Sequence, residues 1–286
     1  MSLTIEDDPM SKPISYDRPR TLDAALALAS SAELALAGGA FTLTQVLLPY
    51  DHVIDMQDVP ELKPIEQRGD ALFLGGAVTL QAVIESPLVP VAFKRAIERV
   101  IPLNMRNGAS VGESVLALRE PMLREWLAAL VACGAQVELA APSGIRSSMS
   151  ILEAAQTNLP RAIIVGVSIP LAREREAVGA AFVGRTPADQ PIVNAAARVR
   201  LNEGGQVTEA TAALCGASPE PVIRLALTAL LDNPLSESSI ASGMSTIASA
   251  VNPVGDYLGS ADYRREMARV MVQRALLDCL AQLGAN

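Results

Sequence analysis

The amino-acid sequence predicts an α+β protein in which two small α/β units precede an antiparallel sheet covered by helices. Short apolar runs alternate with helical patterns from Ile14 to Ile169, as they do in α/β units. Further on, the turn Asn202-Glu203-Gly204-Gly205 joins two runs of strand character and predicts a hairpin. Helical patterns then dominate from 219 to 283. Together these observations define the predicted fold class.

Composition and charge describe a compact protein without a surface for nucleic acid. The chain has 286 residues, of which 50% are apolar and 19% are charged, as in globular domains. Its formal net charge is −8, whereas a protein that binds a nucleic-acid phosphate backbone needs a basic face. Aromatic residues make up only 3% of the chain, which leaves no stacking platform for single strands. Nucleic acid is therefore excluded as a partner.

The few cysteines and histidines exclude several kinds of site. Cys133, Cys215 and Cys279 lie far apart without a Cys-x-x-Cys spacing, and His52 is the only histidine. This pattern excludes a zinc–thiolate site or an iron–sulfur cluster built by this chain alone, and it leaves little room for a histidine-based triad. We predict core thiols in a reducing compartment, no metal ligands and no catalytic side chains. The acidic N-terminus does not resemble a signal peptide, so the expected location is the cytoplasm, without a membrane span.

The first α/β unit follows a loose tail at residues 1–13. A strand at 14–16 precedes a helix that Thr21 caps and that begins with Leu22. The next strand, at 34–37, runs into Ala37-Gly38-Gly39-Ala40-Phe41-Thr42-Leu43. Paired glycines after a strand allow backbone N–H groups to approach a phosphate, although such a pair is also found in plain turns. A further strand is predicted at 53–56.

The second unit contains an irregular segment that we interpret as a binding loop. It opens with a strand at 71–74 and the pair Gly75-Gly76, and a helix is predicted at 91–100. Residues 104–115 combine small residues and turn formers without a helical or strand period, which is typical of binding loops. The unit is completed by elements predicted as a helix at 121–133 and strands at 136–140 and 162–169.

The charged run at 171–177 marks a domain boundary or, as an equally good interpretation, a solvated turn inside one domain. Beyond it, the pattern predicts strands at 180–183, 192–201 and 207–214. Helices are predicted at 219–231, 239–251 and 261–283, and the last of these carries one apolar face for packing.

Several motifs along the chain, taken in order, resemble one family. They are Ile14-Ser15-Tyr16-Asp17-Arg18-Pro19, Ala37-Gly38-Gly39, Val53-Ile54-Asp55-Met56, Leu74-Gly75-Gly76-Ala77-Val78-Thr79, Arg106-Asn107 and Gly259-Ser260-Ala261-Asp262-Tyr263-Arg264-Arg265. The ordered set resembles the FAD-binding (medium) subunit of molybdenum hydroxylases, the group of carbon monoxide dehydrogenase, xanthine dehydrogenase and aldehyde oxidoreductase. The resemblance covers nearly the whole chain from Ile14.

This resemblance implies a fold, a cofactor and partners. The fold is a vanillyl-alcohol-oxidase-like FAD-binding region at 14–173, with subdomains at about 14–62 and 63–173, and a C-terminal flavoprotein-type domain at 177–286. FAD would receive electrons from a 2Fe-2S small subunit, beside a molybdopterin large subunit, in a dimer of heterotrimers. The implied FAD-binding residues are Ala37, Gly38, Gly39, Ala40, Phe41, Thr42, Leu43, Thr79, Asn107, Ser110, Val111, Gly112, Ser114, Glu120, Arg185 and Asp189.

Three departures from the family pattern leave a second function open. Ala40 replaces a polar residue, Glu113 replaces the second glycine of the loop at 110–115, and Arg124 replaces an acid. A carboxylate about 5 Å from a phosphate charge is repelled by roughly 3 kcal/mol at an effective dielectric near 20. Arg119 and Arg124 either offset Glu113 or lie on a solvated helix face, and Arg185 with Asp189 forms either a flavin contact or a hairpin salt bridge. The alternative function is a cofactor-free structural or interaction subunit; a self-contained flavin oxidase is a more distant third.

Overall fold

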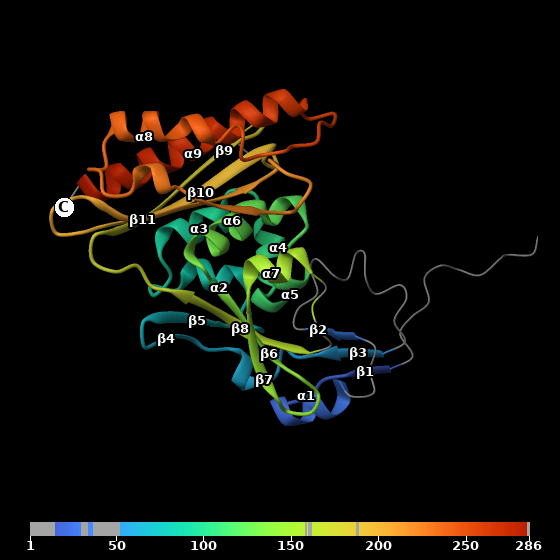
Figure 1. Ribbon diagram of the computed structural model, residues 1–286. Coiled ribbons are helices and arrows are strands. Elements are labelled where there is room, and N and C mark those ends of the chain that lie inside the picture. The colour runs from blue at the N-terminus through green and yellow to red at the C-terminus, as the bar shows by residue number, and fades with distance from the viewer. Residues whose placement is uncertain are drawn as a thin grey trace, which may run out of the picture.

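The computed structural model describes residues 15–29, 34–36, 52–157, 159, 162–186 and 189–284. Its elements stack in layers (Figure 1). A helical layer lies between a five-stranded and a four-stranded sheet, and further helices cover the outer face of the four-stranded sheet. A small three-stranded sheet lies at the opposite end of the molecule from those outer helices.

The three-stranded sheet is parallel, with the order β1-β3-β2. Helix α1, predicted to begin with Leu22, packs against it and buries Leu22, Ala25, Leu26 and Ala29. The elements of this part are β1 (Ser15–Asp17), α1 (Leu22–Ala29), β2 (Leu34–Leu36), β3 (His52–Asp55) and the 3-10 turn η1 (Pro60–Leu62).

The five-stranded sheet is antiparallel, with the order β4-β5-β8-β6-β7. Its central strand β8 is apolar along most of its length because it lies between two other strands and its side chains pack into a hydrophobic cluster on each face of the sheet. The outer strands β4 and β7 expose polar side chains and lack an apolar alternation, so the sequence patterns did not predict them. The strands are β4 (Ile65–Arg68), β5 (Ala71–Gly75), β6 (Gln136–Ala140), β7 (Arg146–Ser150) and β8 (Ile163–Pro170).

The helical layer corrects one prediction. Residues 104–115, which we expected to be irregular, form two short helices, α4 and α5, separated by Ala109 and Ser110. Each has only six residues, too few for a helical period to be visible in the sequence. The helices are α2 (Leu80–Glu85), α3 (Val91–Glu98), α4 (Leu103–Gly108), α5 (Val111–Leu116), η2 (Pro121–Leu123), α6 (Arg124–Cys133) and α7 (Ile151–Gln156).

The four-stranded sheet is antiparallel, with the order β12-β11-β10-β9, and its two central strands are rich in alanine. Small side chains let helices approach both faces: α6 contacts one and α9 the other. At Gly179 a Cβ atom would lie 2.1 Å from the Ala275 carbonyl oxygen, so this close approach requires glycine. The elements are β9 (Glu176–Val183), β10 (Val193–Leu201), β11 (Val207–Cys215), β12 (Ile223–Ala226), η3 (Thr228–Leu230), α8 (Glu237–Gly243), η4 (Met244–Thr246) and α9 (Ala261–Gly284).

Two predicted helices of the C-terminal part differ from the structure. The helix predicted at 219–231 is wrong: the segment forms strand β12 and the turn η3. Its side chains alternate between half-buried Ile223 and Leu225 and exposed Arg224 and Ala226, which is the period of a strand. The helix predicted at 239–251 ends early, because α8 stops at Gly243 and a 3-10 turn follows. The hairpin between β10 and β11 and the long helix α9 are confirmed.

Helix α6 is hydrogen-bonded to the four-stranded sheet at both of its ends. At its start, Arg124 Nη1 donates to the Pro191 carbonyl at 2.9 Å and Asn194 Nδ2 donates to the Arg124 carbonyl at 3.1 Å. At its end, Arg198 Nη1 donates to the Cys133 carbonyl at 2.8 Å. Since α6 is also the centre of the N-terminal core, it belongs to both parts of the chain.

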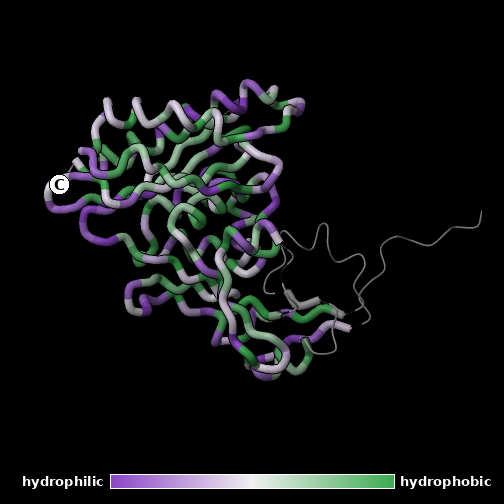
Figure 2. Tube along the Cα trace, in the orientation of Figure 1, coloured by the Kyte–Doolittle hydropathy of each residue, from purple (hydrophilic) through white to green (hydrophobic). Residues whose placement is uncertain are grey.

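Burial explains the chemistry of the three thiols. Hydrophobic stretches gather in the interior strands and helices (Figure 2), and Cys133, Cys215 and Cys279 are free and buried there. Burial raises the pKa of each thiol to about 12. The prediction of core thiols is therefore confirmed. None of the helices in the described part of the chain has the length and apolar character of a membrane span.

Candidate functional site

The predicted FAD-binding residues fall into three groups in the structure. Ala37–Leu43, the first glycine loop, lies outside the described residues. Thr79 pairs with Ser110 in an isolated bridge, which brings the start of α2 beside the start of α5. Arg185 and Asp189 lie in the connection between β9 and β10.

The first turn of α5 uses its backbone donors within the protein. The N–H of Val111 donates to the Val78 carbonyl and that of Gly112 to the Gly76 carbonyl, both at 2.8 Å. Ser110 caps the helix: its Oγ accepts from the N–H of Glu113 at 3.1 Å, and its carbonyl accepts from that of Ser114 at 2.9 Å. The N–H groups at 111–114, which a helix N-terminus offers to an anion, are thus engaged.

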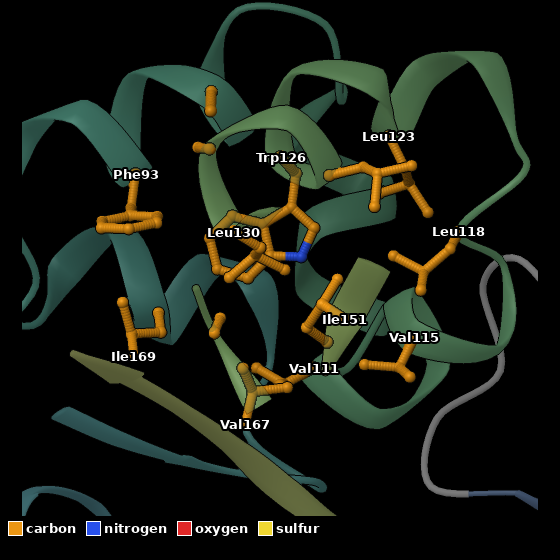
Figure 3. Close-up of a cluster of buried hydrophobic side chains, with 14 of the residues drawn as sticks. Phe93, Val111, Val115, Leu118, Leu123, Trp126, Leu130, Ile151, Val167 and Ile169 are labelled. Atoms are coloured by element: carbon orange, nitrogen blue, oxygen red, sulfur yellow. The ribbon is translucent and has the colours of Figure 1, made fainter. Parts of the chain in front are cut away.

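The hydroxyl groups around this turn are engaged as well. Thr79 caps α2, and its hydroxyl oxygen accepts from the N–H of Ala82 at 3.1 Å. Ser114 Oγ donates to the Val111 carbonyl at 2.7 Å and accepts from Trp126 Nε1 at 3.1 Å. Val111 and Val115 point into the same apolar cluster as Trp126 (Figure 3). This turn is therefore part of the core packing.

Glu113 is enclosed within the same turn. Its exposed fraction is 0%, and its neighbours Gly112 and Ser114 are also buried. A buried carboxylate close to a diphosphate adds electrostatic repulsion in a region where water screens little. Gly76, whose carbonyl accepts from Gly112, has room only for hydrogen: a Cβ atom there would lie 2.2 Å from the Ile164 carbonyl oxygen. The first turn of α5 is thus hydrogen-bonded to Gly76, which in turn packs closely against Ile164.

The remaining predicted residues near this turn have separate surroundings. Asn107 is exposed on α4. Glu120 precedes η2, and its N–H donates to the Ala117 carbonyl at 2.8 Å. Arg124 does not lie on a solvated helix face, because its guanidinium donates to the Pro191 carbonyl and burial lowers its pKa. Arg119 is exposed.

A cleft of 400 Å³ lies where the N-terminal region meets the C-terminal domain. Arg185 and Asp189 line it and form an ion pair with 3.8 Å between Nε and Oδ2, and Tyr257, which is 87% exposed, adds an aromatic ring. The sequence reasoning missed Tyr257 and Leu258, although they directly precede the Gly259-Ser260-Ala261-Asp262-Tyr263-Arg264-Arg265 motif. The other lining residues are Val100, Pro102, Met122, Gln190 and Ile192.

Arg264 holds two sides of this cleft together. It is 3% exposed, and its Nη1 donates to the Ile192 carbonyl at 2.7 Å and to the Gly216 carbonyl at 3.2 Å. Its Nη2 donates to both carboxylate oxygens of Asp256 at 2.7 Å, and these bonds lower the pKa of that carboxyl. Because Ile192 and the segment after Asp256 both line the cleft, Arg264 sets their separation.

The interdomain cleft fits part of FAD, whereas the first turn of α5 does not. The cleft lies between the N-terminal region and the C-terminal domain and is lined by Arg185 and Asp189, two of the residues that the resemblance implies for FAD, and its size and mixed polar and apolar lining fit a ring system. The first turn of α5 does not fit the pyrophosphate, because the N–H groups at 111–114 are engaged and Glu113 is buried within it.

Comparison with known families and proteins agrees with this architecture. Residues 12–172 match the family described as the FAD binding domain in molybdopterin dehydrogenase, and residues 181–279 match the CO dehydrogenase flavoprotein C-terminal domain. The carbon monoxide dehydrogenase medium chain of Hydrogenophaga pseudoflava is 25% identical over 282 residues, covering 91% of this chain and 95% of that one. The 6-hydroxypseudooxynicotine dehydrogenase complex subunit alpha of Paenarthrobacter nicotinovorans is 28% identical over 240 residues, covering 80% and 79%.

Solved structures share the fold. The carbon monoxide dehydrogenase from Hydrogenophaga pseudoflava that lacks the Mo-pyranopterin moiety aligns with a TM-score of 0.81 at 24% identity, over 95% of this chain and 99% of that chain. Quinoline 2-oxidoreductase from Pseudomonas putida 86 aligns with a TM-score of 0.80 at 22% identity, over 94% and 98%. The chain therefore belongs to the FAD-binding (medium) subunits of the molybdenum hydroxylases, a family of oxidoreductase subunits.

Proposed function

We propose that this chain is the electron-transfer subunit of a molybdenum hydroxylase complex, located in the cytoplasm. A 2Fe-2S small subunit and a molybdopterin large subunit are its proposed partners, arranged as a dimer of heterotrimers. The observation that carries the proposal is the cleft to which both matched domains contribute, with Arg185, Asp189 and Tyr257 at its surface. Its position supports a flavin between the two domains.

The residues proposed to hold FAD divide between two places. Arg185, Asp189 and Tyr257 would contact the ring system in the cleft. We assign the pyrophosphate to Ala37–Leu43, since the N–H groups at 111–114 are engaged within the protein. When bound, FAD supplies the redox chemistry, accepting electrons from the iron–sulfur partner and releasing them to an external acceptor. The chain itself binds and orients the cofactor and needs no nucleophile or general base.

The test is a spectrum of the purified protein, alone and with its partner chains. The visible absorbance is recorded, and flavin released by denaturation is quantified against protein. We expect one FAD per chain in the assembled complex. A colourless medium chain in a complex that still contains iron–sulfur clusters and molybdenum would overturn the electron-transfer proposal.

A second function is favoured by the hydrogen bonding of α5. The engaged donors at 111–114 and the buried Glu113 are what a cofactor-free structural or interaction subunit would have. Such a subunit would keep the layers and the clamped helix α6 while it joins the other chains of the complex. The flavin content of the complex separates the two functions.

A further inference from the structure

A second cavity, of 640 Å³, lies between α3, β9 and the C-terminal part of α9. It shares no lining residue with the cleft described above. Ala180 and Ala181 on β9 face Val91, Ala92 and Ala96 on α3 across it. Its volume lies within the range of small-molecule sites, about 300–1,000 Å³, and alanines on both sides leave space for an apolar ligand.

The backbone edge of β9 is already covered beside this cavity. The N–H of Ala180 donates to Asp278 Oδ2 at 3.2 Å, and Gln282 Nε2 donates to the Val178 carbonyl at 2.9 Å. Side chains of α9 thus occupy positions that an added strand would need. The cavity therefore suits a small apolar body better than an extended peptide.

Charged groups around the cavity form ion pairs or hydrogen bonds within the protein, apart from one. Glu125 pairs with Arg99, Glu176 with Arg198, and Glu98 with Arg106, the last with 4.0 Å between the charged atoms. Asp278 accepts from the N–H of Ala180. The four acids of the lining, Glu98, Glu125, Glu176 and Asp278, are therefore all engaged.

Arg99 and Arg95 have different roles at this site. Arg99 lies over the ring of Phe182, 3.2 Å from its centroid, in addition to its pair with Glu125. Arg95 is exposed in the last turn of α3, and its guanidinium makes no hydrogen bond or ion pair with any residue that the structure describes. An anionic group at this mouth would therefore find a cation without a competing partner.

We propose that this cavity binds an amphipathic carboxylate, with its apolar chain or ring over β9 and its carboxylate at Arg95. The apolar body replaces water beside Ala180, Ala181 and Phe182, and the carboxylate accepts hydrogen bonds from the Arg95 guanidinium. The proposal does not depend on whether the chain holds FAD, because the two sites share no lining residue.

The test is calorimetric titration of the full chain with octanoate and, as a neutral probe of similar size, octan-1-ol. Octanoate is expected to bind more tightly than octan-1-ol. Arg95→Gln should weaken octanoate binding by about tenfold, as expected for one charge-assisted hydrogen bond, and leave octan-1-ol binding unchanged. Ala180→Trp, at an exposed strand position, should fill the cavity and weaken both probes.

Two control variants lie on other parts of the surface. Arg146→Gln removes an exposed arginine from β7, and Ala226→Trp places the same bulk at an exposed position of the opposite edge strand β12. Both should bind the probes like the unchanged protein. Undetectable octanoate binding, or equal losses of both probes in Arg95→Gln, would overturn the proposal. Arg95→Gln changes only a surface side chain, so the test stands even if Ala180→Trp does not fold.

Discussion

The two ends of the predicted FAD site use their polar groups in opposite ways. In the first turn of α5, the N–H groups at 111–114 and the hydroxyls of Ser110 and Ser114 bond within the chain. In the interdomain cleft, Arg185 and Tyr257 are exposed and Asp189 is half-buried. Within this one fold, the first turn of α5 is used for packing, whereas the cleft is open to a ligand. A shared fold therefore does not imply that every cofactor contact of the family is kept.

The largest effect is expected from Arg264, on which the cleft is built. Arg264→Met should lower the free energy of unfolding by about 2–5 kcal/mol, because the carbonyls of Ile192 and Gly216 lose a buried donor and the half-exposed carboxylate of Asp256 loses its partner. Denaturant unfolding measures the change. Arg265→Met, which removes an exposed cation paired with Asp262, serves as the control and should cost little. A small loss in Arg264→Met would show that the cleft does not depend on this side chain.

A substitution of Glu113 tests whether the first turn of α5 affects the affinity for FAD. Glu113→Gln keeps the shape of the buried side chain and removes its charge, so FAD should bind more tightly, by up to about a hundredfold if the carboxylate lies some 5 Å from a phosphate. Flavin fluorescence during titration measures the affinity. Glu153→Gln is a matched control, since Glu153 also follows a serine cap by three positions but is exposed. Unchanged affinity would place the carboxylate away from the pyrophosphate.

Ser114 tests whether the first turn of α5 is a structural element. Ser114→Ala leaves Trp126 Nε1 buried without its acceptor and should lower the free energy of unfolding by about 1–3 kcal/mol. Ser147→Ala, at an exposed position on β7, provides the control in the same denaturant experiment. If both variants were equally stable, the hydrogen bond to Trp126 would have no part in holding this turn.

The smallest expected effect is the pH dependence of the free energy of unfolding that Asp256, beside the interdomain cleft, contributes. Hydrogen bonds from Arg264 lower the pKa of Asp256 in the folded protein. The stabilisation is therefore complete above the unfolded pKa, near 4, and is lost as the pH falls through the lower folded pKa. The free energy of unfolding should decrease toward acid less steeply in Asp256→Asn than in the unchanged protein. Asp262→Asn, at an exposed position on α9, should keep the original slope, and identical slopes in all three proteins would contradict the prediction.

Strong local patterns predicted much of the fold. β6 has the predicted bounds Gln136–Ala140, where apolar residues alternate with polar ones, and α9 begins at the predicted Ala261, directly after the turn residues Gly259 and Ser260. Edge strand β7 and the short helices α4 and α5 depend on tertiary hydrogen bonds, which leave no periodic trace in the sequence. Pro219 and Pro221 precede β12, where the sheet overrides the helical character of Leu225 to Leu231.

The candidate site was less predictable than the fold. The family motifs indicated Ser110 and Gly112, but the sequence did not show that Val78 and Gly76 accept from the N–H groups of residues 111 and 112. Tyr257 reaches the cleft because Arg264 draws the segment after Asp256 toward Ile192. Contacts of this kind join residues far apart in the chain, and local patterns contain no information about them.

The clamped helix α6 has a consequence for how the two matched domains move. Since Pro191 and Asn194 bond its first residue and Arg198 its last, the charged segment at 171–175 is a connection and not a hinge. A cut there would leave two fragments that still share one core. Heating should therefore unfold both domains in a single transition. A partner chain that binds and moves one domain would move the other with it.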